Sequence, residues 1–188
     1  ANKGCATASL HPMRSFSNPA LSLEQYPGTY CAIEGDAKAL KRLKPLFEAI
    51  GSVVYHIKQE KKSIYHAAGV FASNYLLTLA KQATDCLTEA GVDETIGLNI
   101  IADLMQGTLS NLKHTQSLKT SLTGPIQRSD VNTIKKHLEA INNAEQQSLY
   151  RALGKATLPI TNLNQNTKKA LNAALEYPPK SHDLASKK

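Results

Sequence analysis

The chain has 188 residues, of which 41% are hydrophobic and 20% are charged, a mixture typical of a soluble globular protein that buries its own core. This composition excludes an intrinsically disordered chain. The aromatic content of 5%, with no tryptophan, leaves few rings on which single-stranded nucleic acid could stack. The formal net charge of +7 is compatible with binding nucleic acid, with binding anionic substrates or simply with solubility, and it does not distinguish among these roles.

The first 57 residues predict a small α/β unit. A short strand is expected over 6–10, and runs rich in β-branched and aromatic residues predict two more strands at 29–34 and 52–57. Between the last two, apolar residues spaced three and four apart predict a helix that Asp36 caps. Strand, helix and strand over about thirty residues make a βαβ-like unit.

The rest of the chain predicts helices. No proline interrupts 61–90, so this segment predicts one long helix, apolar on most sides through 65–72 and therefore buried or part of a subunit interface. The remainder predicts four further helices: over 93–114, from Asp130, from Ala144, and over 166–177.

These elements predict a domain organisation in three segments. Residues 1–57 form an α/β remnant, residues 58–177 form a helical domain, and the polar tail 178–188 is expected to be disordered. The chain begins at Ala1 without a methionine or a signal peptide, and no apolar run reaches the roughly 18 residues that a membrane span needs. We therefore expect a fragment of a longer protein.

The cysteines predict a reducing environment. Cys5, Cys31 and Cys86 match neither the ligand spacing of a zinc site nor a disulfide framework. We therefore expect a cytoplasmic protein without a metal site and without a membrane partner.

The glycines exclude a dinucleotide-binding fingerprint. No two of the ten glycines are separated by a single residue, so the chain contains no G-x-G-x-x-G turn, and it also lacks the phosphate-binding loop with its lysine. The chain as given cannot hold a pyrophosphate in the usual manner of a Rossmann fold.

One face of the predicted long helix carries a polar stripe. Lys62, His66, Gly69 and Ser73 fall within an arc of about 60°. An ammonium beside an imidazole suits proton transfer near neutral pH, since repulsion between like charges favours loss of a proton from one of them. The notch at Gly69 would let a planar ligand approach the backbone. The alternative is that Lys62 is a solvated first-turn residue and His66 a hydrogen-bonded core residue.

Two loops carry further candidates. His11 precedes a rigid proline directly after a predicted strand, where α/β folds bind ligands, although a plain surface turn explains it equally. In the loop 122–130, Thr123 and Arg128 are candidates for binding an anionic group, and the alternative is an ordinary capped connection between helices. Pairs of basic residues are scattered over four predicted helices, which argues against a nucleic-acid patch.

Four motifs occur together and in order, namely HPMRSF at 11–16, IEGD at 33–36, KSIYHAAGVFASNY at 62–75, and LTGPIQRSD at 122–130. The set resembles a bacterial family of NAD(P)-dependent oxidoreductases in which a Rossmann-like domain precedes a helical domain of unknown function. The helical part resembles the carboxyl-terminal domains of 6-phosphogluconate dehydrogenase, ketopantoate reductase and pyrroline-5-carboxylate reductase. The resemblance covers residues 6–162.

The resemblance implies a fold class and a cofactor. The fold is expected to be mainly α, a helical domain like that of 6-phosphogluconate dehydrogenase preceded by a small α/β remnant of a Rossmann-like domain. It implies that NADP or NAD is bound mainly by a domain absent from this chain, and that two helical domains pair as a homodimer. Ser129 departs from the glycine that the family has at this position, so the turn there is expected to differ.

The resemblance also assigns residues. It implies that Lys62 is the general acid/base, and His66 stands where 6-phosphogluconate dehydrogenase relatives have an asparagine that holds the substrate, which puts the substrate and the reaction in doubt. Ser73 and Asn74 are expected to bind the substrate. Thr123 and Arg128 are further candidates for that role, and His11 and Gly69 are expected to lie beside the cofactor.

The sequence thus predicts the carboxyl-terminal part of an NAD(P)-dependent oxidoreductase that transfers a hydride to or from a small polar substrate. As this fragment, the chain is expected to be inactive and to bind no nucleic acid. The alternative is a non-catalytic helical module for dimerisation or ligand binding, in which the polar stripe is structural.

Overall fold

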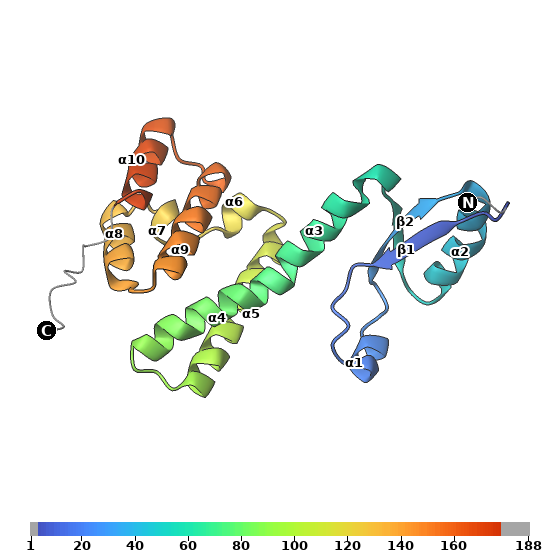
Figure 1. The fold of residues 1–188 in the computed structure, drawn as a ribbon, viewed down its shortest axis with the longest axis horizontal. Coiled ribbons are helices and arrows are strands. Elements are labelled where there is room, and N and C mark those ends of the chain that lie inside the picture. Colours follow the sequence, from blue (N-terminus) through green and yellow to red (C-terminus); the bar gives the residue numbers. More distant parts are fainter. Residues whose placement is uncertain (1–3, 178–188) are drawn as a thin grey trace, which may run out of the picture. The chain divides into compact units, whose positions relative to one another are not determined.

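The computed structural model describes residues 4–177, and Figure 1 shows their fold. The chain groups into two compact units, residues 1–79 and 80–188. The predicted boundary between the domains 1–57 and 58–177 stays a prediction. It separates domains of a protein family, whereas the two units are defined by contacts between residues. The predicted disorder of 178–188 lies outside the described residues.

A three-stranded sheet organises the first unit (Figure 1). Strand β1 (Ala8–Pro12) pairs antiparallel with β2 (Tyr30–Gly35), and β2 pairs parallel with β3 (Val53–His56). The central strand β2 is the most deeply buried of the three: Cys31, Ala32 and Ile33 are almost fully inaccessible. Burial raises the pKa of the Cys31 thiol.

The predicted βαβ unit is confirmed. Helix α2 (Ala37–Ala49) connects the two parallel strands and packs against both. Asp36 occupies the N-cap position, but its carboxylate accepts a hydrogen bond from the Thr7 backbone N–H at 2.7 Å and none from the helix. The predicted cap is therefore wrong in its hydrogen bond, because the start of the chain competes for the same carboxylate.

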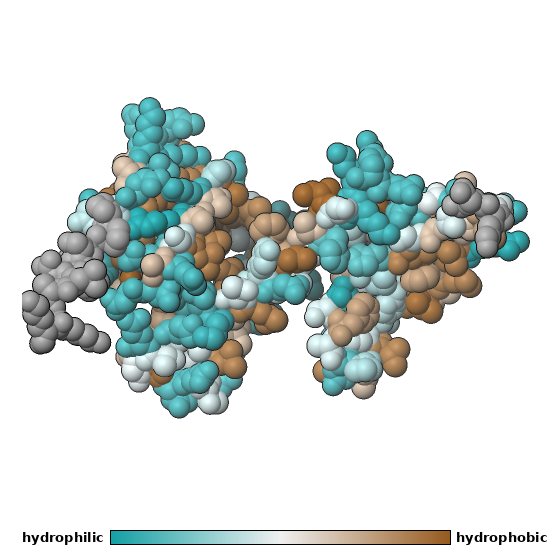
Figure 2. Space-filling model, viewed as in Figure 1, coloured by the Kyte–Doolittle hydropathy of each residue, from teal (hydrophilic) through white to brown (hydrophobic). Residues whose placement is uncertain are grey.

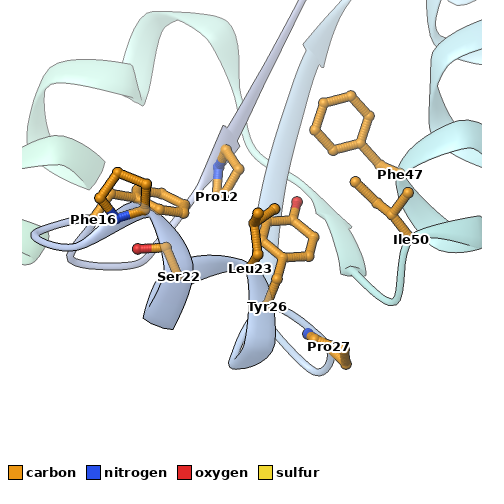
Figure 3. A pocket seen from close by; sticks show the side chains of 9 residues that line it. Pro12, Phe16, Ser22, Leu23, Tyr26, Pro27, Phe47 and Ile50 are labelled. Carbon is orange, nitrogen blue, oxygen red and sulfur yellow. The ribbon is translucent and has the colours of Figure 1, made fainter.

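An apolar cavity of about 770 Å³ lies beside the sheet, between α1 (Pro19–Glu24) and α2. Figure 3 shows Phe47 and Ile50 reaching it from the α2 side, opposite Phe16 and Leu23. The lining is completed by Pro12, Pro19, Ser22, Tyr26 and Pro27. Several large apolar side chains of this unit are exposed to solvent, and Figure 2 shows hydrophobic residues gathered around α2.

The prediction of a single helix over 61–90 is wrong. The structure has a 3-10 turn (Gln59–Lys61), then α3 (Lys62–Ala72) and α4 (Asn74–Glu89), which are separated at Ser73. The Ser73 hydroxyl lies 2.7 Å from the Gly69 carbonyl oxygen, one turn earlier. The break lies in the backbone of Ser73, whose φ of −122° and ψ of −70° depart from helical values. The same kind of side-chain bond occurs at Thr108 inside α5 without a break.

The second unit is entirely helical over its described residues, and the four predicted helices are confirmed. Its further helices are α5 (Glu94–Thr115), α6 (Leu118–Ser121), α7 (Gly124–Gln127), α8 (Val131–Ala140), α9 (Ala144–Thr157), a 3-10 turn (Leu158–Ile160) and α10 (Gln165–Leu175). Buried side chains from α8, α10 and the 3-10 turn form its core, namely Ile134, Leu138, Leu158, Leu171, Ala174 and Leu175. Within residues 4–177, no helix combines the length and the apolarity needed to cross a lipid bilayer.

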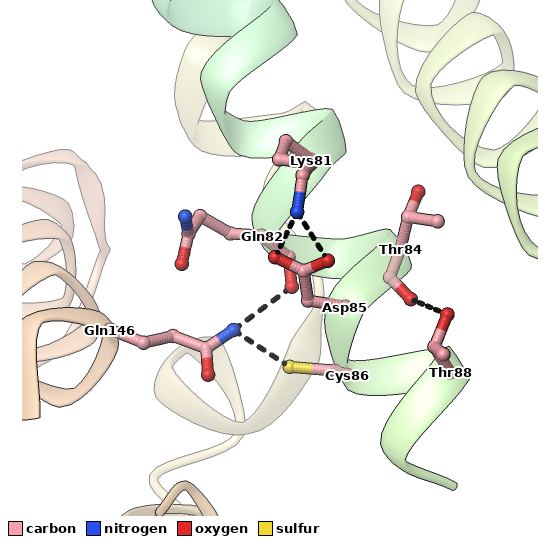
Figure 4. Close-up of polar contacts among 7 residues, drawn as sticks. All are labelled: Lys81, Gln82, Thr84, Asp85, Cys86, Thr88 and Gln146. Carbon is pink, nitrogen blue, oxygen red and sulfur yellow. Dashed lines mark hydrogen bonds and ion pairs between the residues drawn. The ribbon is translucent and has the colours of Figure 1, made fainter. Parts of the chain in front are cut away.

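Helices α4 and α9 are joined by polar contacts. Gln146 of α9 donates through Nε2 to the Gln82 carbonyl oxygen at 3.0 Å, and the same nitrogen lies 3.3 Å from Cys86 Sγ (Figure 4). Lys81 and Asp85 form an ion pair one turn apart on α4. The Gln146 side chain therefore links α9 to α4 through a part-buried hydrogen bond.

Ser129 adopts a backbone conformation that favours glycine, because its φ is 60°. An L side chain in this region costs about 1 kcal/mol, whereas glycine enters it freely. We expect Ser129→Gly to raise the free energy of unfolding by about 1 kcal/mol, measured by urea denaturation. Ser148→Gly, an exposed change inside α9, should lower it by about 0.5 kcal/mol. If the Ser129→Gly variant were no more stable than wild type, the prediction of backbone strain at Ser129 would be wrong.

Candidate functional site

Two adjoining cavities of the first unit bring together most of the predicted site residues. The larger cavity, of about 540 Å³, lies between residues 11–15 and residues 66–74, and the smaller one, of about 370 Å³, lies between His11 and the first turns of α3. His11 and His66 line both cavities, with ring centroids 5.8 Å apart. The histidine pair therefore marks the point where the two cavities meet.

Lys62 lines the smaller cavity and is held by a buried carboxylate. Its Nζ donates to Glu34 Oε1 at 3.0 Å and to Ser9 Oγ at 2.7 Å. Glu34 is only 9% exposed, whereas the Lys62 side chain is half exposed. A buried carboxylate needs a charged partner, so the pair fixes the ammonium. Since an ammonium carries three protons, one remains for a ligand in the cavity.

His11 lies within β1 and not in a loop after it. Its strand pairing continues to Pro12 opposite Cys31, so the loop expected to begin at residue 11 begins after Pro12. Because β1 runs antiparallel to β2, this end of β1 lies beside the amino end of β2. The expectation that His11 directly follows a strand is wrong, because the strand extends to Pro12, but His11 lines both cavities.

Tyr65 lines the smaller cavity, packs against His11 and is hydrogen-bonded to Tyr55. The Tyr65 ring meets the His11 ring edge-on at 5.5 Å, and its hydroxyl accepts a hydrogen bond from the Tyr55 hydroxyl at 2.8 Å. Burial, followed by the contact with Tyr55, raises the pKa of Tyr65. The phenol therefore stays protonated and neutral beside the histidine pair.

The raised pKa of Tyr65 has a consequence at alkaline pH. A tyrosine in the unfolded chain ionises near pH 10, while Tyr65 in the folded chain keeps its proton beyond that point. The corresponding stability is complete below about pH 10 and is lost as the pH rises through the folded-state pKa. We expect Tyr65→Phe to flatten the fall of unfolding free energy above about pH 10. Tyr30→Phe, at an exposed ring, should leave that slope unchanged, and equal slopes in all three proteins would contradict the prediction.

Gly69, Ser73 and Asn74 line the larger cavity, and the structure shows what the glycine accommodates. A Cβ at Gly69 would lie 2.9 Å from Met13 Sδ, so the missing side chain makes room for Met13. The Ser73 hydroxyl, with one proton to donate, lies close to both the Gly69 carbonyl oxygen and Asn74 Oδ1, at 3.0 Å from the latter. The roles expected for these three residues toward cofactor and substrate stay predictions.

Thr123 and Arg128 belong to the second unit. Thr123 precedes α7 at its N-cap position and Arg128 ends that helix, and both residues are exposed. Asp130, two positions later, caps α8 as predicted by accepting from the Thr133 backbone N–H at 3.0 Å. The connection is therefore a capped turn between helices, and a part for Thr123 and Arg128 in substrate binding stays a prediction.

Glu34 and Arg14 are site residues that sequence reasoning did not single out. Glu34 is an acidic residue in an otherwise apolar strand, and that contrast is the signal that could have identified it. Arg14 lines the larger cavity, and its guanidinium donates to Gln25 Oε1 at 2.6 Å and to Thr29 Oγ1 at 3.4 Å. Its partners are 11 and 15 residues away, so no local spacing pointed to them.

The junction between β2 and α2 contains a single glycine and not the glycine-rich turn that binds a pyrophosphate in a Rossmann fold. Gly35, the last residue of β2, has a φ of 127°, which glycine adopts readily. A Cβ there would meet the Thr7 carbonyl oxygen at 2.5 Å, so the backbone before β1 packs directly against this glycine. Among residues 4–177, no group of three or more His, Cys, Asp or Glu side chains is arranged to hold a metal ion.

Comparison with known proteins places the chain among related structures. A family model described as "Domain of unknown function (DUF2520)" matches residues 29–157. Protein TM1727 from Thermotoga maritima is 31% identical, with a TM-score of 0.60 over 90% of this chain and 61% of that chain. The "putative NADP oxidoreductase BF3122" from Bacteroides fragilis is 23% identical, with a TM-score of 0.63 over 82% of this chain and 58% of that chain. No curated protein matches the chain.

These similarities establish the fold of the chain and show how much of each solved relative it covers. A mainly helical chain with a small sheet, and a fold shared with an NADP-oxidoreductase-like structure, agree with the expected fold class. The chain spans about three fifths of the length of the two solved relatives. A structure of pyrroline carboxylate reductase from Plasmodium falciparum, with NADP bound, is 15% identical over 93% of this chain and 61% of that chain, with a TM-score of 0.46.

Proposed function

Because the chain belongs to the DUF2520 family, we propose that it is the carboxyl-terminal part of an NAD(P)-dependent oxidoreductase acting on a small polar substrate. Its fold is that of an NADP-oxidoreductase-like structure, and it spans about three fifths of that relative. The helical part corresponds in this proposal to the carboxyl-terminal domain of 6-phosphogluconate dehydrogenase and ketopantoate reductase. The NADP or NAD is bound mainly by a domain outside this chain, in keeping with the absence of a G-x-G-x-x-G motif from this sequence.

The observation that carries the proposal is the ammonium of Lys62, held by buried Glu34 on a cavity that His11 and His66 share. The nicotinamide group, when bound, supplies or accepts a hydride. Lys62 then donates its remaining proton to a substrate oxygen, or takes it back in the reverse direction. Glu34 and Ser9 orient the Lys62 ammonium and are positioning residues.

The other candidate residues bind the substrate or the cofactor. In this proposal His66, Ser73 and Asn74 hold the substrate along the larger cavity, and His11 and Gly69 lie at the cofactor side. Thr123 and Arg128 are weaker candidates for binding an anionic substrate. The isolated chain is inactive, because it lacks most of the cofactor site.

The proposal includes a homodimer through the helical domain. Helix α4 exposes Leu77, and helix α5 exposes Ile96 and Leu104; exposed apolar side chains of this kind favour association. Sedimentation equilibrium of the 188-residue chain should give twice the monomer mass. A monomer at all concentrations would remove the dimer from the proposal.

The experiment for the activity uses the full-length protein that carries this chain. It is incubated with NADPH deuterated at the transferable position and with a panel of small aldehydes, ketones and imines. We expect deuterium in the product of at least one compound, found by mass spectrometry. A non-catalytic helical module, the alternative function, predicts that the deuterium stays on the nicotinamide with every compound.

A further inference from the structure

We propose that the larger cavity binds an oxyanion of the substrate, a carboxylate or a phosphate, and that Arg14 is the residue that binds it. That the ligand is a substrate rests on the proposed function. The binding of an oxyanion is argued from the cavity alone. Three observations support it: the residues that line the cavity, the absence of an acidic partner for Arg14 among the described residues, and the hydrogen bonds that hold the backbone next to Arg14.

The lining of the larger cavity is basic and rich in donors. Its polar residues are His11, Arg14, Ser15, His66, Ser73 and Asn74. No carboxylate is among the residues that line it; the others are Pro12, Met13, Gly69, Val70 and Ala72. A concave surface with cationic and hydroxyl or amide groups, and without acidic ones, concentrates positive potential and favours an anion.

The charge of Arg14 is available to a ligand. The guanidinium donates to two neutral oxygens, Gln25 Oε1 and Thr29 Oγ1. Within residues 4–177 the ion pairs that form use Lys44, Lys62, Lys81 and Lys155, and none uses Arg14. A guanidinium has five N–H donors in a planar fork that matches a carboxylate or phosphate. Two neutral contacts therefore orient the group without cancelling its charge.

The backbone around Arg14 is fixed by the sheet. The N–H of Met13 donates to the Tyr30 carbonyl oxygen at 2.8 Å, which extends the β1–β2 ladder by one residue. Thr29, which the guanidinium contacts, directly precedes β2 and is only 5% exposed. A charged group placed by a sheet edge and a buried threonine is preorganised, so little ordering cost is incurred on binding.

The two cavities then divide one substrate between them. Arg14 lies on the larger cavity and Lys62 on the smaller one, and His11 and His66 lie on both. A substrate that spans the histidine pair presents its oxyanion to Arg14 and its reacting oxygen to Lys62. The substrate class is accordingly a small hydroxy or oxo compound that also carries a carboxylate or phosphate.

The test measures anion binding to the 188-residue chain by NMR, without cofactor. Sodium acetate and inorganic phosphate are titrated separately, and we expect saturable shifts of the His11, His66 and Ser73 signals at millimolar concentrations, the range of a single weak contact. Arg14→Gln should raise the dissociation constant at least tenfold. Arg42→Gln, an exposed arginine on α2 with the same loss of charge, should leave it unchanged.

Two further variants keep the proposal testable if Arg14→Gln does not fold. Arg14→Lys keeps the charge but not the fork, and should weaken binding severalfold. His66→Gln, at an exposed ring without hydrogen bonds in the described structure, should also weaken it severalfold. Absence of saturable shifts in the wild type, or equal affinity in Arg14→Lys, His66→Gln and wild type, would overturn the proposal.

A phosphate on the cofactor is the other possible source of an oxyanion, and 2′,5′-ADP tests it. We expect 2′,5′-ADP to bind this cavity no tighter than inorganic phosphate, and a tenfold tighter affinity, lost in Arg14→Gln, would overturn the assignment to substrate. The anion titration needs no hydride transfer. Anion binding without deuterium transfer would therefore overturn the proposed function alone, and deuterium transfer without anion binding would overturn this proposal alone.

Discussion

Full-length protein carrying Lys62→Met is expected to turn over at least about 100-fold more slowly than wild type, with its affinity for the nicotinamide cofactor unchanged. Removal of a general acid/base costs typically 10²–10⁴ in rate. Lys62 contacts Ser9 and Glu34, and in the proposed function a domain outside this chain binds most of the cofactor. The measurements are kcat by the deuterium assay and cofactor binding by fluorescence.

The control for Lys62→Met must separate chemistry from stability. Glu34 is buried and has Lys62 as its charged partner, so removal of the ammonium leaves a carboxylate that is costly to bury. The double variant Lys62→Met/Glu34→Gln removes both charges and should recover thermal stability but not turnover. Lys61→Met changes the exposed neighbouring lysine and should behave as wild type. A folded Lys62→Met protein with near-normal kcat would end the assignment.

Leu171→Ala is expected to lower the free energy of unfolding by about 3 kcal/mol, within the 2–5 kcal/mol found for buried leucines. Leu171 is 0% exposed and belongs to the core that α10 forms with α8. Its truncation removes apolar surface from the core and leaves a cavity that neighbours such as Leu138 cannot fill without moving. Urea denaturation followed by circular dichroism measures the change.

A surface leucine provides the matched control for Leu171→Ala. Leu118 lies in the short helix α6 and is 57% exposed, so the same truncation should cost less than about 1 kcal/mol. Equal losses at Leu171 and Leu118 would show that the buried cluster is not the stabilising core of the second unit.

Local signals made most of the elements predictable. Asp93 and Asp130 precede apolar helical periodicity, and both side chains accept hydrogen bonds from the first turn of the helix that follows. The β-branched run after Gly51 and the strand before Asp36 gave the parallel pair. These features depend on residues a few positions apart, so the sequence carries them directly.

The failures depend on features that no local pattern reports. The backbone of Ser73 departs from helical values and breaks the long helix, although a serine inside a helical pattern is ordinarily tolerated. Asp36 has the composition of a helix cap, but its carboxylate accepts from the N–H of Thr7, 29 residues earlier. Only the folded sheet brings Asp36 and Thr7 together.

The candidate site divides in the same way. The helical period identified Lys62, His66, Gly69 and Ser73, and all four line the two cavities. Glu34 lies 28 residues before Lys62, and its importance follows from burial in the central strand, which periodicity does not report.

The contact between Met13 and Gly69 couples two positions that are far apart in the sequence. A Cβ at residue 69 would lie 2.9 Å from the methionine sulfur, a separation at which one of the two side chains must move. Among homologous chains, a larger residue at 69 should therefore occur together with a shorter one at 13, so that the two positions vary as a pair.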